Sequence, residues 1–185
     1  MPAAQLAHPE PATLPRPCLA SVEPSTLPSP RLRFVRKGDR PALRAFLGRL
    51  SASTLQARYL TMLSRMEGLL ADREIARIVD GDAARHVVVV AEDRADIRAI
   101  GEFVIDTDGR AAELALTVED DFQNHGLGRR LYCRLEALAR RRGVAAFTGD
   151  VRHGNTRMQE LLRATGRPLR MESVYGGVYF TLQLA

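Results

Sequence analysis

The chain has 185 residues, of which 45% are hydrophobic, and it carries a formal net charge of +5. This length suffices for one domain with a buried core, and no hydrophobic run approaches the roughly 20 residues of a membrane-spanning helix, so no membrane partner is expected. Lys37 is the only lysine, and this skew toward arginine indicates coding bias rather than a phosphate-binding surface. No aromatic stacking platform accompanies the run Arg140-Arg141-Arg142, so no nucleic acid is expected either.

Residues 1–30 differ in composition from the rest of the chain. They hold eight of the ten prolines, which remove backbone donors and disfavour helix. We therefore expect a Pro-rich extension over 1–30, disordered or loosely attached, followed by a single domain over 31–185. The N-terminus has no basic segment followed by a hydrophobic one, and the two cysteines form no Cys-x-x-Cys pair. Both observations favour the cytoplasm.

The hydrophobic periodicity predicts strands and helices in alternation after residue 30. Asp39 is expected to cap the first helix, with Pro41 in its first turn. Further helices are predicted over 54–64 and 72–79, from the turn at 123–128 up to Arg142, and over 155–164. The predicted strands cover residues 32–36, 86–91, 97–105, 112–118, 145–151, 169–174 and 178–184. This order indicates an α/β or α+β layered domain with a mixed sheet.

A glycine-containing turn at 123–128 joins the alternating strand 112–118 to the longest predicted helix. The first turn of a helix has unpaired N–H groups and a partial positive charge, and it binds anions. Gly126 and Gly128 let a ligand approach the backbone closely, and Arg129 and Arg130 add positive charge. The turn lacks the third glycine of a dinucleotide fingerprint and the Gly-Lys-Ser/Thr of a P-loop, so it predicts another kind of phosphate ligand.

The pattern that fits is Gln-x-x-Gly-x-Gly, from Gln123 to Gly128, which resembles the GNAT superfamily of N-acetyltransferases. The resemblance covers the chain from about Leu32 onward. It implies a mixed, largely antiparallel central sheet of about six to seven strands flanked by helices, with acetyl-CoA as cosubstrate and no metal. It also implies that the turn holds the pyrophosphate and that the preceding strand edge pairs with the pantetheine arm. The cofactor-binding residues expected on this basis are Leu116, Thr117, Val118, Gln123, Asn124, His125, Gly126, Leu127, Gly128, Arg129, Arg130 and Asn155.

Within the superfamily, residues 49–60 and 112–118 look most like the domains of bacterial protein lysine acetyltransferases. The acceptor implied is a protein lysine. Two alternatives stay open, namely a small amine such as a polyamine or an aminoglycoside-like compound, and a non-catalytic acyl-CoA-binding module. The chain is expected to be a monomer or a homodimer.

Acetylation requires a neutral amine, whereas a lysine of pKa about 10.4 is neutral in only about one molecule in 2,500 at pH 7. A general base is therefore needed, and Glu113, on the strand that leads into the turn, is the candidate. Glu119, Asp120 and Asp121 are alternatives, expected to face solvent or to attract a cationic substrate. In many family members, a tyrosine that acts as general acid lies seven residues after the asparagine that Asn155 matches. Leu162 stands there instead, with Tyr175 or Tyr179 as possible substitutes.

Overall fold

The computed structural model describes residues 30–59 and 65–184. Almost all of the predicted Pro-rich extension and the predicted end of the second helix, residues 60–64, lie outside this part. The strands are β1 (Arg31–Phe34), β2 (His86–Asp93), β3 (Asp96–Ile105), β4 (Ala111–Val118), β5 (Ala146–Arg152), β6 (Leu169–Val174) and β7 (Gly177–Gln183). The helices are α1 (Arg40–Arg49), α2 (Ala52–Tyr59), α3 (Gly68–Asp80), α4 (Leu127–Arg141) and α5 (Thr156–Ala164), with 3-10 turns η1 (Lys37–Asp39) and η2 (Asp120–Phe122).

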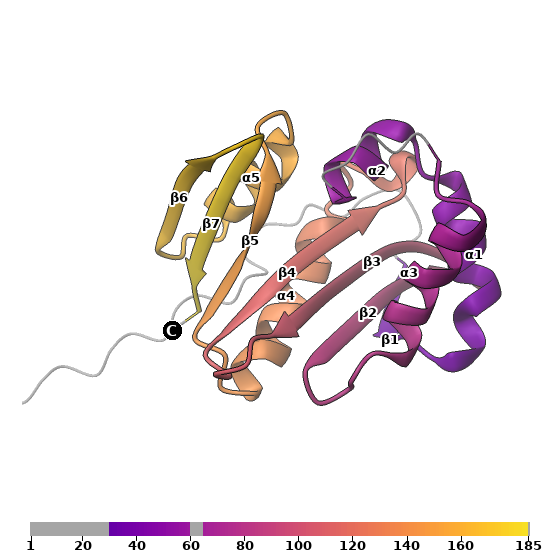
Figure 1. Ribbon diagram of the computed structural model, residues 1–185, viewed down its shortest axis with the longest axis horizontal. Helices are drawn as coiled ribbons and strands as arrows, with labels where there is room; N and C mark the ends of the chain where they lie inside the picture. Colours follow the sequence, from indigo (N-terminus) through magenta and orange to yellow (C-terminus); the bar gives the residue numbers. More distant parts are fainter. Residues whose placement is uncertain (1–29, 60–64, 185) are drawn as a thin grey trace, which may run out of the picture.

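The seven strands form one sheet in the order β1-β2-β3-β4-β5-β7-β6 (Figure 1). Every neighbouring pair is antiparallel except β4 and β5, which run parallel. A parallel pair needs a crossover connection, and α4 supplies it. The predicted mixed, largely antiparallel sheet flanked by helices is therefore confirmed.

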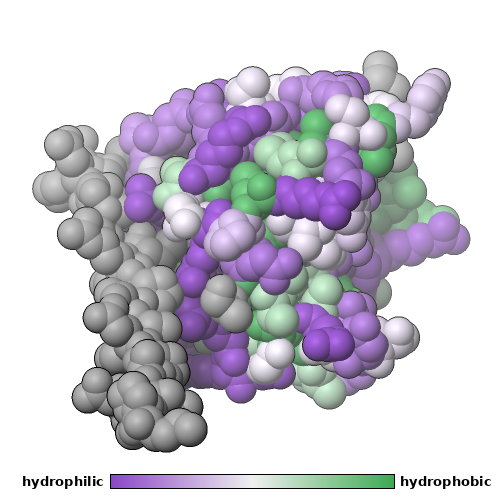
Figure 2. All heavy atoms as spheres, turned by 90° about the vertical axis from the view of Figure 1, so that its left-hand side faces the viewer, coloured by the Kyte–Doolittle hydropathy of each residue, from purple (hydrophilic) through white to green (hydrophobic). Residues whose placement is uncertain are grey.

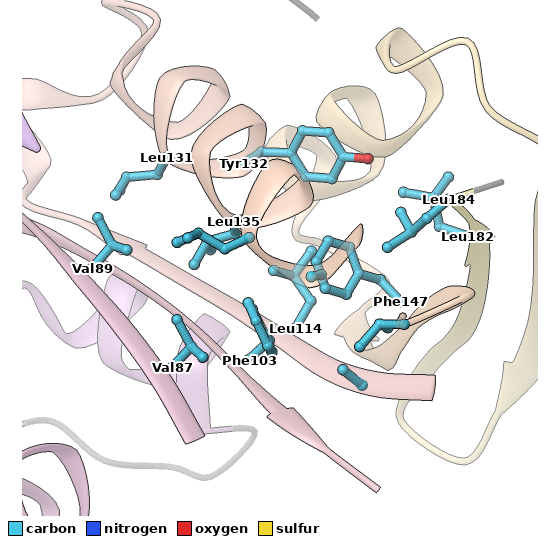
Figure 3. Close-up of a cluster of buried hydrophobic side chains, with 14 of the residues drawn as sticks. Val87, Val89, Phe103, Leu114, Leu131, Tyr132, Leu135, Phe147, Leu182 and Leu184 are labelled. Atoms are coloured by element: carbon cyan, nitrogen blue, oxygen red, sulfur yellow. The ribbon is translucent and has the colours of Figure 1, made fainter. Parts of the chain in front are cut away.

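The larger core lies between α4 and one face of the sheet. Leu131 and Leu135, which belong to a stripe of leucines along one side of α4, are fully buried over the strands (Figure 3). Phe147 of β5 extends this cluster toward β7 and packs against Phe103 and Tyr132, with ring centroids 5.8 and 6.2 Å away. Burial of each such side chain contributes about 1.5–3 kcal/mol, so α4 is held firmly against the sheet.

A second core covers the opposite face over β2 and β3, under α1, α2 and α3. Its centre is formed by Phe46, Leu47, Leu55 and Ile75, packed on Val90. Because side chains alternate between the two faces of a strand, the continuous hydrophobic run of β2 serves both cores. The helix α3 is longer than predicted, since it begins at Gly68 rather than at residue 72.

The segment between β1 and α1 departs from its expected role. Asp39 occupies the N-cap position of α1 but makes no side-chain cap bond to that helix. Its carboxylate instead accepts the N–H of Arg36 at 2.8 Å and both guanidinium nitrogens of Arg33, at 2.7 and 2.9 Å. Lys37 lies exposed in this turn at the β1 edge.

No helix in residues 30–59 and 65–184 is long and hydrophobic enough to cross a membrane.

Candidate functional site

The neighbouring strands β4 and β5 are paired over only three residues each. The register runs from Ala111 opposite Ala146 to Glu113 opposite Thr148. Beyond Glu113 the two strands separate (Figure 1), which leaves the β4 edge from Leu114 to Val118 without a strand partner on that side. An extended edge of this kind offers free N–H and C=O groups to a ligand.

A cleft of about 1060 Å³ occupies this separation. One wall is formed by β4 residues 113–118, and others by α2, by the end of β5 and by α5. Gly149 of β5 allows close approach at the fork, because a Cβ there would lie 2.9 Å from Phe180 and 3.2 Å from the carbonyl oxygen of Leu114. The cleft therefore begins where the sheet divides and runs along the open edge of β4.

The far end of the cleft is the predicted turn. Asn124 and Gly126 both adopt left-handed backbone conformations, with φ of 63° and 76°, which Asn tolerates and Gly adopts at little cost. This turn directs the N-terminus of α4 toward the cleft, and the N–H groups of its first turn have no acceptor within the helix. A Cβ on Gly128 would meet nothing closer than Val118, at 3.8 Å, so the approach to these donors is open.

Most of the predicted site residues line this one cleft. They are Glu113, Leu116, Thr117, Val118, Gln123, Asn124, Gly126, Gly128, Arg129 and Asn155. Three predicted residues do not line it. The side chain of Leu127 is buried in the α4 core, the guanidinium of Arg130 donates to the carbonyl of Pro30 at 2.9 Å, and His125 is exposed. Leu127 and Arg130 can therefore contribute only their backbone N–H groups to the binding of an anion.

Glu113 lies at the fork itself and is exposed. It makes no side-chain hydrogen bond or ion pair with any other residue in the described part of the chain. Its register partner on β5 is Thr148, and by alternation Asp150, two residues further, lies on the same face. Glu113 is thus a carboxylate open to whatever enters the near end of the cleft.

Two of the three acids before the turn do not behave as expected. Glu119 is buried and its carboxylate accepts Arg49 Nε at 2.8 Å and Arg98 Nη1 at 3.2 Å. Asp120 accepts Ser51 Oγ at 2.6 Å and Thr54 Oγ1 at 2.9 Å. The expectation that these two face solvent or attract a substrate is therefore wrong, because they attach the turn to the α1–α2 junction. Asp121 is exposed, as expected.

Hydrogen bonding keeps Asp120 ionised. Burial alone would raise its pKa, but the bonds donated by Ser51 and Thr54 outweigh it, so that the pKa of Asp120 is lowered. Bonds to the charged form of a carboxyl group have this effect. Asp120 is consequently ionised at neutral pH, where its carboxylate holds the turn in place rather than accepting a proton.

Asn155 begins α5 as predicted. Its Oδ1 accepts the N–H of Met158 at 3.2 Å, an N-cap bond, and the residue also lines the cleft. Leu162, where many family members have a tyrosine, is fully buried. The proposed substitutes Tyr175 and Tyr179 are exposed on β6–β7 and do not line the cleft.

Tyr59 of α2 is the one tyrosine that lines the cleft in the described part of the chain, and sequence reasoning missed it. Its hydroxyl donates to Glu74 at 2.9 Å. Burial and the neighbouring Glu74 carboxylate raise the pKa of Tyr59. The proton of Tyr59 is therefore held between α2 and α3.

A buried carboxylate under the cleft was also missed. Glu102 of β3 is 4% exposed and accepts Arg77 at 2.7 and 2.9 Å, His86 Nε2 at 2.6 Å, and Arg58 of α2. The sequence around Glu102 does not reveal its ionic partners, because these residues lie 16 to 44 positions away along the chain. Glu102 thus fixes α2 and α3 to the sheet.

Replacing Glu102 by glutamine is expected to lower the free energy of unfolding by about 3 kcal/mol at pH 7, because two guanidinium groups lose their buried counter-charge. Burial opposes ionisation of Glu102, but the bonds from His86 and Arg77 outweigh it and lower its pKa. Its stabilising contribution is therefore complete above the unfolded pKa of about 4.3 and is lost as the pH falls toward the folded value.

Urea unfolding of both proteins at pH 7 and at pH 3.5 measures this difference. Glu113→Gln serves as the matched control, since Glu113 is exposed and has no such partners. A wild-type advantage over Glu102→Gln that stays constant between the two pH values would contradict the role given to this carboxylate.

The site fits coenzyme A in three respects visible in the structure. The helix N-terminus with its open glycine suits the pyrophosphate, the unpaired β4 edge suits the amides of the arm, and the cleft joins the two. No group of three or more histidine, cysteine, aspartate or glutamate side chains able to hold a metal ion occurs in residues 30–59 and 65–184.

Comparisons with known proteins agree with this geometry. The model of the acetyltransferase (GNAT) family matches residues 54–166. A curated acetyltransferase of Pseudomonas aeruginosa is 27% identical over 133 residues, which cover 71% of this chain and 70% of that protein.

Solved structures share the fold. The GNAT domain of PAT from S. lividans has a TM-score of 0.74 at 22% identity, over 83% of this chain and 90% of that domain. The PaiA N-acetyltransferase from Thermoplasma acidophilum, in complex with coenzyme A, has a TM-score of 0.63 at 13% identity, over 84% and 99%. A cAMP-binding acyltransferase from Mycobacterium smegmatis is 25% identical with a TM-score of 0.55, over 83% of this chain but only 43% of that protein. The chain therefore belongs to the GNAT family, as an acetyl-CoA-dependent N-acetyltransferase.

Proposed function

We propose that the protein transfers an acetyl group from acetyl-CoA directly to the amine of a protein lysine in the cytoplasm, with Glu113 as general base. The observation that carries this proposal is the single cleft that joins Glu113, the unpaired edge of β4 and the turn before α4. About 17 Å of strand separates Glu113 from Val118, a span that suits an extended pantetheine arm laid along β4.

Acetyl-CoA supplies the acetyl group as a thioester. The Glu113 carboxylate takes a proton from the acceptor ammonium, directly or through a water, which yields the neutral amine that can attack. The amine nitrogen then bonds to the acetyl carbon, and the N–H groups on the open edge of β4 can donate to the acyl oxygen lying beside the strand. The C–S bond breaks, and coenzyme A leaves as the thiol after taking up the proton that the new amide nitrogen loses. The turn amides and the start of α4 bind the pyrophosphate at the other end of the cleft.

The surroundings of Glu113 favour an amine that belongs to a macromolecule, such as a lysine side chain of a protein. Glu113 is exposed, and on the same sheet face Asp150, Tyr179 and Gln183 of β5 and β7 are exposed as well. Figure 2 shows the β6 edge of this half of the sheet, where hydrophobic residues lie among polar ones. An open surface of this kind accommodates a macromolecule, whereas a small substrate is usually enclosed in a pocket. The resemblance of residues 49–60 and 112–118 to lysine acetyltransferase domains supports the same acceptor.

A small cationic amine is the second candidate, and three carboxylates favour it. Glu113, Asp150 and Glu160 line the cleft, and their carboxylates make no hydrogen bond or ion pair with other residues in the described part of the chain. A polyamine could be attracted by these charges without any protein surface.

Acceptor profiling is expected to show faster coenzyme A release with a lysine-containing peptide than with spermidine or an aminoglycoside. The measurement follows thiol release, with mass spectrometry of each acceptor. The matched control is the same peptide with arginine in place of lysine, which keeps the charge and removes the amine. Turnover of spermidine alone would establish the small-amine alternative. Acetyl-CoA binding without turnover of any acceptor would indicate a non-catalytic binding module.

A further inference from the structure

The first turn of α2 is attached to the segment that precedes the cofactor turn. The Asp120 carboxylate accepts both the N–H and the hydroxyl of Ser51, at 3.0 and 2.6 Å. Ser51 immediately precedes α2, and its Oγ accepts the N–H of Thr54 at 3.2 Å, as an N-cap does. The start of α2 therefore depends on where Asp120 is held.

Thr54 joins this attachment to the turn itself. Its hydroxyl donates to Asp120 Oδ1 at 2.9 Å and accepts Gln123 Nε2 at 3.1 Å. The same amide nitrogen of Gln123 donates to the carbonyl of Val118 at 2.9 Å, and its Oε1 accepts Arg157 of α5 at 2.6 Å. A hydroxyl has one proton to donate, so Thr54 is the donor on one side and the acceptor on the other. The side chain of Gln123 thereby connects α2, the end of β4 and α5.

The remainder of α2 lies along β4, away from the turn. Thr54 is beside the turn, whereas Arg58, one helical turn later, bonds Glu102, and the register partner of Glu102 on β4 is Ala115. Both Arg58 and Tyr59 line the cleft. The helix that starts at the cofactor turn thus forms a wall of the cleft on the way toward Glu113.

From these contacts we propose that Thr54 is a positioning residue that couples acetyl-CoA binding to the ordering of α2. An opening of α2 that includes its first turn must break the bonds of Thr54 to Asp120 and Gln123 and so disturb the turn. A ligand that holds the turn then disfavours that opening and prepares the wall of the cleft for the acceptor. A second ligand that binds to an already ordered helix loses less conformational entropy, which is positive cooperativity. The inference rests on the proposed placement of the pyrophosphate at this turn.

Hydrogen exchange with mass spectrometry tests the coupling with acetyl-CoA alone, at a hundred times its dissociation constant. In the wild type, exchange of α2 amides is expected to slow by up to about 100-fold, since that is the factor by which ligand disfavours openings that destroy its site. Amides of α3, which makes no side-chain hydrogen bond or ion pair to residues 123–128 in the described part of the chain, are expected to slow less. Thr54→Val keeps the shape of the side chain and removes the hydroxyl. In this variant, the slowing of α2 exchange by acetyl-CoA is expected to decrease, while acetyl-CoA still protects the start of α4. Thr54→Ser should restore the slowing of α2 exchange.

The outcomes separate two failures. If acetyl-CoA protects neither α4 nor α2 in the wild type, the cofactor site itself is absent and the proposed function fails. If α4 is protected while α2 is unchanged, or if Thr54→Val protects α2 as well as the wild type does, the coupling is overturned. Should Thr54→Val not fold, the comparison of α2 with α3 in the wild type and in Thr54→Ser decides the question.

Discussion

Replacement of Gly126 by glutamate is expected to abolish the stabilisation of the protein by acetyl-CoA. At a hundred times its dissociation constant, a ligand that binds only the native state adds about 2.7 kcal/mol to the free energy of unfolding, which thermal unfolding detects as a higher Tm. In the variant, a carboxylate lies beside the donors that would hold the pyrophosphate, and like charges repel. Gly126 also has φ of 76°, so any side chain adds roughly 1–2 kcal/mol of backbone strain.

Gly109→Glu is the matched control for this experiment. Gly109 lies in the turn between β3 and β4 with nearly the same φ, 75°, and nothing lies within 4 Å of a Cβ there. The same substitution at the same backbone conformation should therefore lower the Tm while leaving the shift with acetyl-CoA intact. An unchanged ligand shift in Gly126→Glu would mean that the cofactor does not bind at this turn.

Replacement of Glu113 by glutamine is expected to lower kcat by roughly 10²–10⁴ at pH 7, the contribution of a general base, with acetyl-CoA binding retained. The deficit should shrink as the pH approaches the acceptor pKa of about 10.4, because the amine then loses its proton without help. Initial rates across this pH range, together with the thermal shift, measure both effects on the same protein.

Glu160→Gln provides the comparison for Glu113. Glu160 also lines the cleft and is also exposed, but it lies on α5, away from the fork. Its replacement removes one negative charge from the cleft and should change kcat little. Equal losses in the two variants would assign the effect to the charge of the cleft rather than to proton removal.

The sequence was most informative where local pattern and tertiary role coincide. The alternation of β4 and the leucine stripe of α4 each bury one face, so periodicity alone located both elements and the glycine turn between them. The β2–β3 connection gave no such signal, because its left-handed positions are Arg94 and Ala95 rather than Asn or Gly. The ends of strands that are set by such residues could not be predicted from the sequence.

The candidate site was predictable along β4 and the turn, but not across the cleft. The three adjacent acids after Val118 were predicted to be solvated. Glu119 is instead buried, and its carboxylate is paired with Arg49, 70 residues earlier in the chain. The separation of β4 from β5 depends on how far two distant segments stay paired, which no local pattern encodes. The same holds for Glu102, whose ionic partners come from α2, α3 and β2.

The exposed lysine in the turn before α1 has a consequence for an enzyme that modifies amines. Lys37 is the only lysine of the chain and lies beyond β1, while the cleft opens between β4 and β5, three strand spacings or about 14 Å further across the sheet. The protein thus offers a single lysine side chain as a target for its own chemistry, and that lysine is remote from the proposed reaction centre at Glu113. An acetyl group found on Lys37 would therefore record an encounter between two molecules rather than an event within one.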